Sequence, residues 1–313
     1  MEKVVIALGG KSLQPKGNHP TAEAQLKVVK KTCEHLADIS CKGYEIAIVH
    51  GNGPQVGDIL LASEEAGDVT PAMPFDVCGA MSQGYIGYHL QQALKYAMSA
   101  RGKNIPGLRV ATQVIVEKNE PAFANPIKPI GASYTEEEAK VMQAEKGFPM
   151  REYGNKGWRR LVASPAPQRI VELDAIKAMW GSKIVISCGG GGIPVIENMD
   201  GTLEGVAAVI DKDYAAELLA ENLNADVLLI LTEVENVALN WNTPEQQNLS
   251  SMSLKEGAKY IEEGQFQAGT MLPKVEAAMK FVRCYPDKKA IITSLDKAME
   301  ALEGKSGTTI TFA

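Results

Sequence analysis

The chain has 313 residues, of which 45% are hydrophobic, 22% charged and 6% aromatic, and its net charge is −6 at pH 7. This composition is typical of a folded globular protein with one large or two small domains. The acidic balance argues against a broad nucleic-acid-binding surface. No apolar run approaches the roughly 20 residues of a membrane helix. The amino terminus lacks a secretory pattern, and the five cysteines form no CxxC pair. We therefore expect a protein of the reducing cytoplasm without a disulfide or zinc framework.

Short apolar runs rich in β-branched residues alternate with longer helical patterns. The strands are apolar almost throughout, as expected where a sheet is covered on both faces. This alternation predicts an α/β fold with a mostly parallel sheet between two helix layers. The predicted strands are 3–8, 45–50, 109–117, 183–188, 226–232 and 289–294, and the predicted helices are 21–43, 213–224 and 272–285.

Residues 118–168 interrupt the alternation. This region holds six of the 16 prolines together with five aromatic residues. A disordered linker would be poorer in aromatic residues, so we expect a folded excursion, either a small subdomain or a lid. The division between two lobes is placed between residues 169 and 182, which gives an N-terminal lobe of about 1–175 and a C-terminal lobe of about 176–313.

Three predicted strands end in glycine clusters. The clusters are "LGGKS" at 8–12, "HGNGPQVG" at 50–57 and "CGGGGIP" at 188–194. In an open α/β sheet, ligands bind outside the carboxyl ends of the strands. Glycine at these positions lets the backbone approach a ligand and point N–H groups at an anion. One such cluster is equally compatible with a tight turn, whereas three together favour a binding site.

Two well-known phosphate-binding motifs fit these clusters poorly. A Walker A loop needs a glycine five residues before Gly10-Lys11-Ser12, and Val5 stands there instead. The stretch "GNGPQVG" is one residue longer than the usual dinucleotide fingerprint, and no clear acidic residue follows for a ribose. A nicotinamide-dependent dehydrogenase therefore remains an alternative, although the glycine pattern fits it poorly.

Lysines occur at positions where a bound polyanion would explain them. Lys212 lies between Asp211 and Asp213 at the start of a predicted helix, where an aspartate is an ordinary N-cap. A lysine in a first helical turn is unfavourable, because that end of the helix dipole is positive. Lys274 has a similar position, and Lys128 lies in a proline-flanked segment. Convergence of the three lysines around an acid would suit phosphoryl transfer, which depends on neutralising negative charge.

Other chemistries have weaker signals. No GxSxG nucleophile motif occurs. Arg159 and Arg160 are interpreted as a solvated pair in preference to an anion clamp, because exposure is the default for charge. His50 is expected to pack or cap and not to act as a base. The four histidines show no spacing typical of metal ligands; they are His19, His35, His50 and His89.

Together, these motifs resemble the carbamate kinases of the amino-acid-kinase superfamily. The resemblance covers nearly the whole chain, in the family's order. The matching segments are "ALGG" (7–10), "HGNGPQVG" (50–57), "PAMPFDVCGAMSQGYIGY" (71–88), "NPIKPIG" (125–131), "GWRRLVASP" (157–165), "SCGGGGIPV" (187–195), "AVIDKDYA" (208–215), "MLPKVEAA" (271–278) and "AIITS" (290–294).

The resemblance implies a three-layer αβα sandwich with a small protruding subdomain at about 118–168. The N-terminal lobe would bind carbamate or carbamoyl phosphate, and the C-terminal lobe would bind the nucleotide. The implied reaction is reversible phosphoryl transfer between MgATP and carbamate, giving ADP and carbamoyl phosphate. Such enzymes serve ATP generation in arginine or purine catabolism. The implied cofactors are ATP or ADP and Mg²⁺, with no metal ligand assigned to the protein, and the implied assembly is a homodimer.

Site residues are carried over from the same motifs. The implied catalytic residues are Lys128, Lys212, Asp213 and Lys274, with the aspartate organising the lysines. The implied substrate-binding residues are Gly9, Gly10, Lys11, Gly51, Asn52 and Gly53. The implied nucleotide-binding residues are Gly189, Gly190, Gly191, Thr232, Met271 and Lys274.

The first glycine corner departs from the family pattern. Carbamate kinases read "GGNAL" where this chain reads "GGKSL", so Lys11 replaces an asparagine. Lysine supplies donors and a charge but no acceptor. Three outcomes are open: Lys11 adds a phosphate contact, it turns outward or pairs with an acid such as Asp213, or it spoils carbamate binding. The last would make the chain a substrate-altered or non-catalytic relative that binds nucleotide or carbamoyl phosphate.

Overall fold

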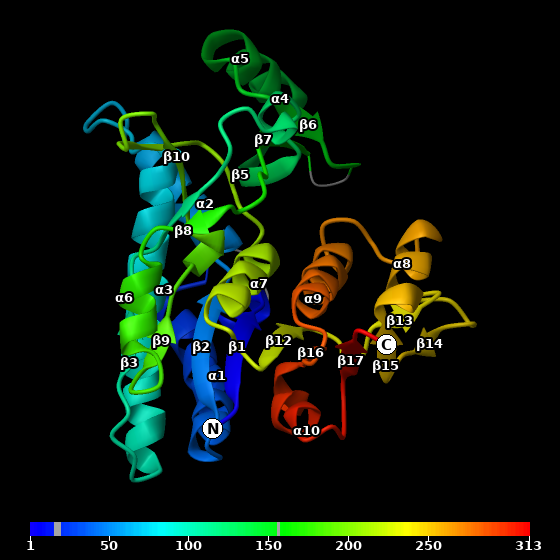
Figure 1. Cartoon of the computed structure of the whole chain (residues 1–313). Helices are drawn as coiled ribbons and strands as arrows, with labels where there is room; N and C mark the ends of the chain where they lie inside the picture. Colours follow the sequence, from blue (N-terminus) through cyan, green and yellow to red (C-terminus); the bar gives the residue numbers. More distant parts are fainter. Residues whose placement is uncertain (16–19, 155–156) are drawn as a thin grey trace.

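The computed structural model describes residues 1–15, 20–154 and 157–313, and an eight-stranded sheet forms its centre (Figure 1). The strand order is β15-β17-β16-β12-β1-β2-β9-β3, and every neighbouring pair is parallel except β16 and β17. The strands are β1 (Lys3–Leu8), β2 (Glu45–His50), β3 (Gly107–Arg109), β9 (Ile184–Ile186), β12 (Val227–Thr232), β15 (Ser251–Ser253), β16 (Lys289–Ser294) and β17 (Thr308–Thr311).

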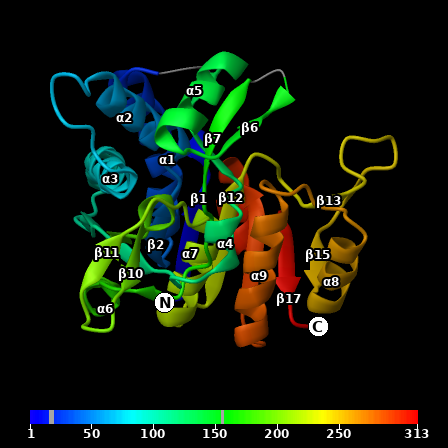
Figure 2. The ribbon, with the colours of Figure 1, turned by 90° about the horizontal axis from the view of Figure 1, so that it is seen from above.

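Helices cover both faces of this sheet, which confirms the predicted αβα layering. Along β1, Val5 and Ala7 pack into the core cluster that includes α7 and α9, whereas Val4, Ile6 and Leu8 pack into the cluster on the other face. Seen from above in Figure 2, β1 and β12 run between these layers. The first layer contains α6 (Leu173–Met179), α7 (Lys212–Asn222) and α9 (Leu272–Cys284), and the second contains α1 (Ala22–Cys41), α3 (Phe75–Ala100) and α10 (Ala298–Leu302).

The predicted strand 109–117 is wrong in one respect, because the chain changes sheets within it. β3 ends at Arg109 in the large sheet, and β4 (Gln113–Ile115) belongs to a second sheet. The side chain of Gln83 on α3 holds the break, since it accepts from the backbone N–H of Thr112 (2.9 Å) and donates to its carbonyl (3.1 Å). The second sheet has the order β11-β10-β4-β8, with β8 (Arg169–Ile170), β10 (Ile193–Glu197) and β11 (Leu203–Gly205).

The proline-rich excursion is folded, as predicted. It forms an antiparallel three-stranded sheet of β5 (Lys128–Tyr134), β7 (Trp158–Val162) and β6 (Met150–Glu152), flanked by α4 (Pro121–Ala124) and α5 (Glu136–Lys146). This unit projects beyond the carboxyl end of the large sheet in Figure 1. Helix α5 is capped at both ends, by a Thr135–Glu138 capping box and by Gly147 at φ 65°.

The prediction for the arginine pair is wrong. Arg160 is not a solvated charge: its side chain is 13% exposed, pairs with Glu64 on α2 (Gly53–Glu65) at 3.0 Å, and lies over the ring of Phe148. Arg159 donates to the carbonyl of Gly131 at 2.9 Å. Both arginines therefore stabilise the excursion and its contact with α2.

The remaining elements are two short strands, one helix and short 3₁₀ turns. None of the helices in the described part of the chain has the length and apolar composition needed to cross a bilayer. His19 and the side chain of Lys11 lie outside what the structure describes. The further elements are β13 (Ala238–Leu239), β14 (Gln247–Asn248), α8 (Leu254–Glu262) and the short 3₁₀ turns η1 (Gly10–Ser12), η3 (Gly189–Gly191) and η4 (Leu295–Lys297).

Candidate active site

The three glycine corners lie side by side at one edge of the large sheet. They follow β1, β2 and β9, which are adjacent strands and parallel, so their carboxyl ends meet. The first two corners are joined directly, because the N–H of Gly51 donates to the carbonyl of Leu8 at 3.1 Å. A Cβ on Gly51 would lie 3.3 Å from the Cδ of Lys212, so this glycine leaves room for the lysine stem. The three corners therefore lie together at this edge of the sheet.

The corner after β9 packs tightly against the corner after β2. A Cβ on Gly190 would lie 2.2 Å from Nδ2 of Asn52, and a Cβ on Gly189 would lie 2.4 Å from Nε2 of His50. Gly190 and Gly191 also have positive φ angles of 69° and 98°. Only glycine meets both demands, positive φ and close approach, without strain.

Two consecutive buried side chains of α3 anchor these two corners to the same helix. Nδ2 of Asn52 donates to Oγ of Ser82 at 2.8 Å, and Nε2 of Gln83 donates to the carbonyl of Gly189 at 2.9 Å. His50 is buried, its Nδ1 lies 2.9 Å from the carbonyl of Gly51, and burial lowers its pKa to about 4. His50 is therefore neutral at physiological pH and has the packing role expected for it.

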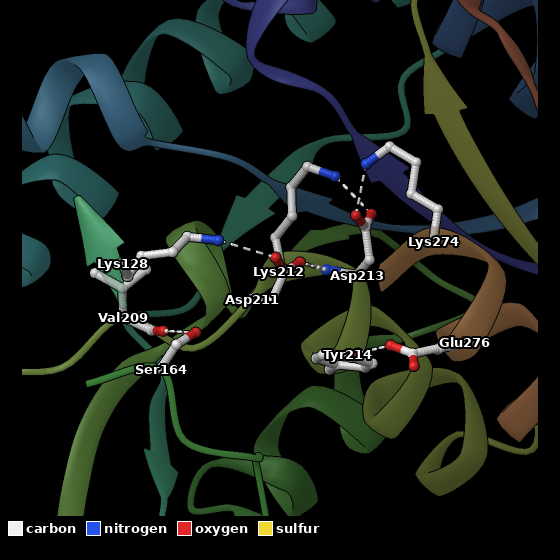
Figure 3. Close-up of polar contacts among 9 residues, drawn as sticks. All are labelled: Lys128, Ser164, Val209, Asp211, Lys212, Asp213, Tyr214, Lys274 and Glu276. Carbon is white, nitrogen blue, oxygen red and sulfur yellow. Dashed lines mark hydrogen bonds and ion pairs between the residues drawn. The ribbon is translucent and has the colours of Figure 1, made fainter. Parts of the chain in front are cut away.

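Helix α7 brings the predicted lysine and aspartate to the same edge. Asp211 is the N-cap, since its Oδ1 accepts from the N–H of Asp213 at 3.0 Å. Asp213 is 2% exposed, and Nζ of Lys212 lies 2.5 Å from its Oδ1. Nζ of Lys274, in the first turn of α9, lies 2.7 Å from its Oδ2. Figure 3 shows both ammonium groups directed at this one carboxylate.

The charges of this group are mutually dependent. Burial alone raises the pKa of the Asp213 carboxyl, but Lys212 and Lys274 outweigh it, so the pKa lies below its ordinary value. Burial lowers the pKa of Lys212, and Asp213 opposes that shift. A buried carboxylate with two cations leaves one excess positive charge for an anionic ligand.

The fourth predicted catalytic residue reaches the same region from the excursion. Nζ of Lys128, at the start of β5, lies 3.0 Å from Oδ2 of Asp211. The pair is partly buried, with the lysine side chain 31% and the aspartate side chain 14% exposed. The structure therefore connects Lys128, through Asp211, with the start of α7 (Figure 3).

A cavity of about 890 Å³ opens on one side of Lys212 and Lys274. The predicted residues Gly9, Gly10, Thr232 and Met271 also line it. Sequence reasoning missed most of the far wall, which comes from loops without a recognisable motif. That wall includes Val234, Ala238 at the start of β13, Asn240, Trp241, Thr243, Gln265, Phe266 and Gln267.

The other predicted site residues lie outside the lining of this cavity. Gly51, Asn52 and Gly53 form the corner after β2 and the first residue of α2. Gly189, Gly190 and Gly191, which the resemblance placed on the nucleotide side, pack instead against His50, Asn52 and the carbonyl of Ile210. The site thus has two parts, the cavity, which the corner after β1 helps to line, and the packed corners after β2 and β9, and Lys212 contacts both.

Comparisons with known proteins agree with this architecture. The amino acid kinase family model matches residues 2–294. The carbamate kinase of Clostridium perfringens is 54% identical, over 98% of this chain and 99% of that protein, and that of Pyrococcus furiosus is 50% identical, over 99% of each. The structure of Giardia lamblia carbamate kinase bound to AMP-PNP superposes with a TM-score of 0.93 at 42% identity, covering 99% of this chain and 98% of that one.

Two observations together define the chain as a kinase. The first is the lysine-rich site at the carboxyl edge of the central sheet, and the second is the set of matches just described. The chain belongs to the amino acid kinase family and is an ATP-dependent phosphotransferase. Within that family, its relatives named above are carbamate kinases, matched over almost their full length. The comparisons give no support to a non-catalytic or substrate-altered relative.

Proposed function

We propose that the chain transfers a phosphoryl group reversibly between ATP and carbamate. In one direction a carbamate oxygen attacks the γ-phosphorus, the bond to the β–γ bridging oxygen breaks, and ADP departs with that electron pair. Carbamoyl phosphate is the other product. The observation that carries this proposal is the pairing of Lys212 and Lys274 with Asp213 at the boundary between the cavity and the glycine corners. Relatives named carbamate kinases support the choice of acceptor.

The two buried lysines would act on the transferring group. In phosphoryl transfer, charge is spread over the phosphoryl oxygens, and most of the catalysis is positioning and charge neutralisation. Lys212 and Lys274 come from different helices, so they can contact the transferring group and the departing ADP oxygens from separate directions. Asp213 fixes both ammonium groups before substrate binds, so that little rearrangement is needed during the reaction.

The glycine corners would hold the acceptor. Gly51 lies next to the Lys212 stem, and α2 begins at Gly53 with Asn52 as its N-cap. The other members of this set are Gly9 and Gly10 in the corner after β1. Backbone N–H groups at a helix start favour an anion such as carbamate or carbamoyl phosphate. Because Gly189 to Gly191 pack against this part of the site, we assign them to the acceptor end and not to the nucleotide.

The cavity would hold the nucleotide. Its volume of about 890 Å³ is typical of a cofactor-binding site and is suited to a nucleotide. Its wall combines Trp241, Phe266 and Met271 with polar groups. Thr232, at the carboxyl end of β12, lines the wall near Lys274. The Giardia lamblia relative was solved with AMP-PNP bound, which supports a nucleotide here.

Magnesium would accompany the nucleotide. This ion is usually held by substrate phosphates plus one or two carboxylates, and not by an all-protein cage. The donor set fits that pattern, because Thr232 and Glu233 are consecutive oxygen-bearing residues in the wall of the cavity. Glu233 and Thr232 would complete the coordination of an ion carried mainly by phosphate oxygens. When bound, Mg²⁺ neutralises charge on the phosphoryl oxygens.

A homodimer would form through the outer face of α3. Val77, Met81 and Tyr88 are 37%, 48% and 58% exposed, and their spacing of four and seven residues places them on one face of the helix. An apolar stripe of this kind on a long surface helix is typical of a covered face. We infer that a second copy of the chain covers it.

A cytoplasmic role in ATP generation from carbamoyl phosphate is consistent with the free cysteines, among them the buried Cys33, Cys78 and Cys188. Arginine or purine catabolism would supply that substrate.

A panel of phosphoryl donors tests the proposed reaction. Purified protein is given Mg²⁺ and ADP with either carbamoyl phosphate or acetyl phosphate, and ATP formation is followed. The proposal predicts rapid ATP formation with carbamoyl phosphate and at least a 100-fold lower kcat/KM with acetyl phosphate, because the two acyl groups differ in their capacity for hydrogen bonding. Absence of ATP formation from carbamoyl phosphate would overturn it. The Lys11→Asn variant is tested in parallel. It measures how the lysine in the first glycine corner, where the family pattern has asparagine, affects the rate.

A further inference from the structure

Asp211 uses its two carboxylate oxygens on two different parts of the molecule. Oδ1 accepts the N–H of Asp213 and so caps α7. Oδ2 lies 3.0 Å from Nζ of Lys128, which belongs to the excursion and is 83 residues away in sequence. Serine, threonine or asparagine would cap the helix about as well. The second contact, to an ammonium group, is the one that calls for a carboxylate.

The backbone already brings these two residues close together. Lys128 on β5 is paired with Val162, the last residue of β7. The next residue, Ala163, pairs with Ala208, and its carbonyl accepts the N–H of Val209 at 2.9 Å. Oγ of Ser164 then donates to the carbonyl of Val209, also at 2.9 Å (Figure 3). The junction between the excursion and the segment leading into α7 is therefore fixed next to the ion pair.

From this geometry we propose that Asp211 is a positioning residue for Lys128. It holds the Lys128 ammonium in a set relation to Lys212 and Asp213, which begin the helix that Asp211 caps. A lysine has a flexible four-carbon stem, and without an acidic partner its ammonium group samples many positions. This inference rests on the proposed function, because it assigns Lys128 to the phosphoryl-transfer site.

The charges of the site allow a positioning role of Asp211 to be distinguished from a mere effect of its negative charge on the net charge of the site. The network contains three lysines, Lys128, Lys212 and Lys274, and two aspartates, Asp211 and Asp213. Removing the charge of Asp211 raises the net positive charge of the site. If only net charge mattered, an anionic substrate would bind more tightly and turnover would not fall. If Asp211 positions Lys128, kcat falls while the KM for carbamoyl phosphate is unchanged or lower.

The test combines Asp211→Asn with Lys128→Met in a double-mutant cycle on the full-length protein. Asparagine retains the capping oxygen, so the midpoint of urea unfolding stays within error of the wild-type value. We expect kcat for ATP formation to fall about 10- to 100-fold, as for other misplacements of a catalytic group by about 1 Å. In the Lys128→Met background, Asp211→Asn then causes no further loss. Asp200→Asn is the matched control, because Asp200 also accepts from the N–H two residues on, but in an exposed turn.

The outcomes separate the two claims. Unchanged kcat in Asp211→Asn, or an equal loss with and without Lys128, overturns the positioning role and leaves the proposed function standing. A fall in kcat accompanied by a matching fall in the unfolding midpoint also overturns it, in favour of a purely structural role. A wild-type protein that forms no ATP overturns the proposed function, and the positioning role with it.

Discussion

Lys274 Nζ lies 2.7 Å from Oδ2 of Asp213, although 61 residues separate the two in sequence. The contact is possible because α7 and α9 pack side by side on one face of the sheet, and further side-chain pairs link them. Nζ of Lys280 lies 2.6 Å from Oε2 of Glu217, and Tyr214 donates to Glu276. Packing between two helices thus sets the spacing of the charges at their amino-terminal ends.

Replacing Asp213 by asparagine is expected to lower the free energy of unfolding by about 3–5 kcal/mol, because it leaves the largely buried ammonium groups of Lys212 and Lys274 without a counter-charge. Both lysine side chains are 14% exposed. Chemical denaturation of the ligand-free protein measures the effect. Adding Lys212→Met to Asp213→Asn removes part of the uncompensated charge and is expected to recover part of the loss. A single variant as stable as the wild type would contradict the account.

Gly190→Ala is expected to raise the KM for carbamoyl phosphate about 10-fold or more and to destabilise the fold, because its Cβ would displace the side chain of Asn52. Gly102→Ala is the matched control, since Gly102 has a φ of 67° against 69° for Gly190 but no atom within 4 Å of the added Cβ. The control isolates the cost of the left-handed backbone, about 1 kcal/mol. Equal effects of the two substitutions on KM would show that the close approach to Asn52 is unimportant.

Glu217 is expected to make stability depend on pH. Burial raises the pKa of its carboxyl to about 7, with Lys280 opposing the shift, whereas in the unfolded chain the carboxyl has its ordinary pKa of 4.5. The native state therefore binds more protons between these values, so the free energy of unfolding falls as pH rises from about 4.5 to about 7. The contribution is of the order of 3 kcal/mol, at about 1.36 kcal/mol per pH unit.

Urea unfolding across this pH range measures the slope for the wild type and for Glu217→Gln. Glutamine cannot ionise, so the variant is expected to lose this part of the pH dependence. The exposed Glu262 on α8 supplies the control Glu262→Gln, which keeps the wild-type slope. A slope that is the same in all three proteins would rule out Glu217 as its source.

Met81→Glu is expected to separate the proposed dimer, because it places a charge in the middle of the apolar stripe on α3. Sedimentation at micromolar concentration should give a dimer for the wild type and a monomer for this variant. Val141→Glu is the control, because Val141 is also exposed, at 52%, but lies on α5 of the excursion. A monomeric wild type, or a variant that remains dimeric, would refute this interface.

Much of the sheet could be predicted because its strands are apolar on both faces. β1, β2 and β16 have the predicted bounds, and β12 begins one residue later than predicted. The 26-residue helix α3 was not predicted, because Pro71 and Pro74 suggested a broken region and the apolar residues on its outer face obscure its periodicity. Proline before a helix marks its start, and Pro74 is the N-cap here.

The charged part of the site was predictable from local anomalies, and the cavity wall was not. Lys212 and Lys274 stood out because each lies in a first helical turn, where a cation is unfavourable without an anionic ligand. Trp241 and Phe266 come from loops whose residues carry no motif, and only the tertiary fold places them together. The partners of Arg160 were likewise invisible in sequence, since Glu64 lies 96 residues away.

The most direct test of the account is the initial rate of ATP formation from ADP, Mg²⁺ and carbamoyl phosphate by wild type and Lys274→Met. Lys255→Met, at an exposed lysine on α8, is the control. We expect wild-type turnover in the control and a loss of about 10²- to 10³-fold in kcat for Lys274→Met, the usual effect of removing one group that stabilises transition-state charge. A Lys274→Met protein that retains more than half of the wild-type rate would contradict the central role given to the lysines around Asp213.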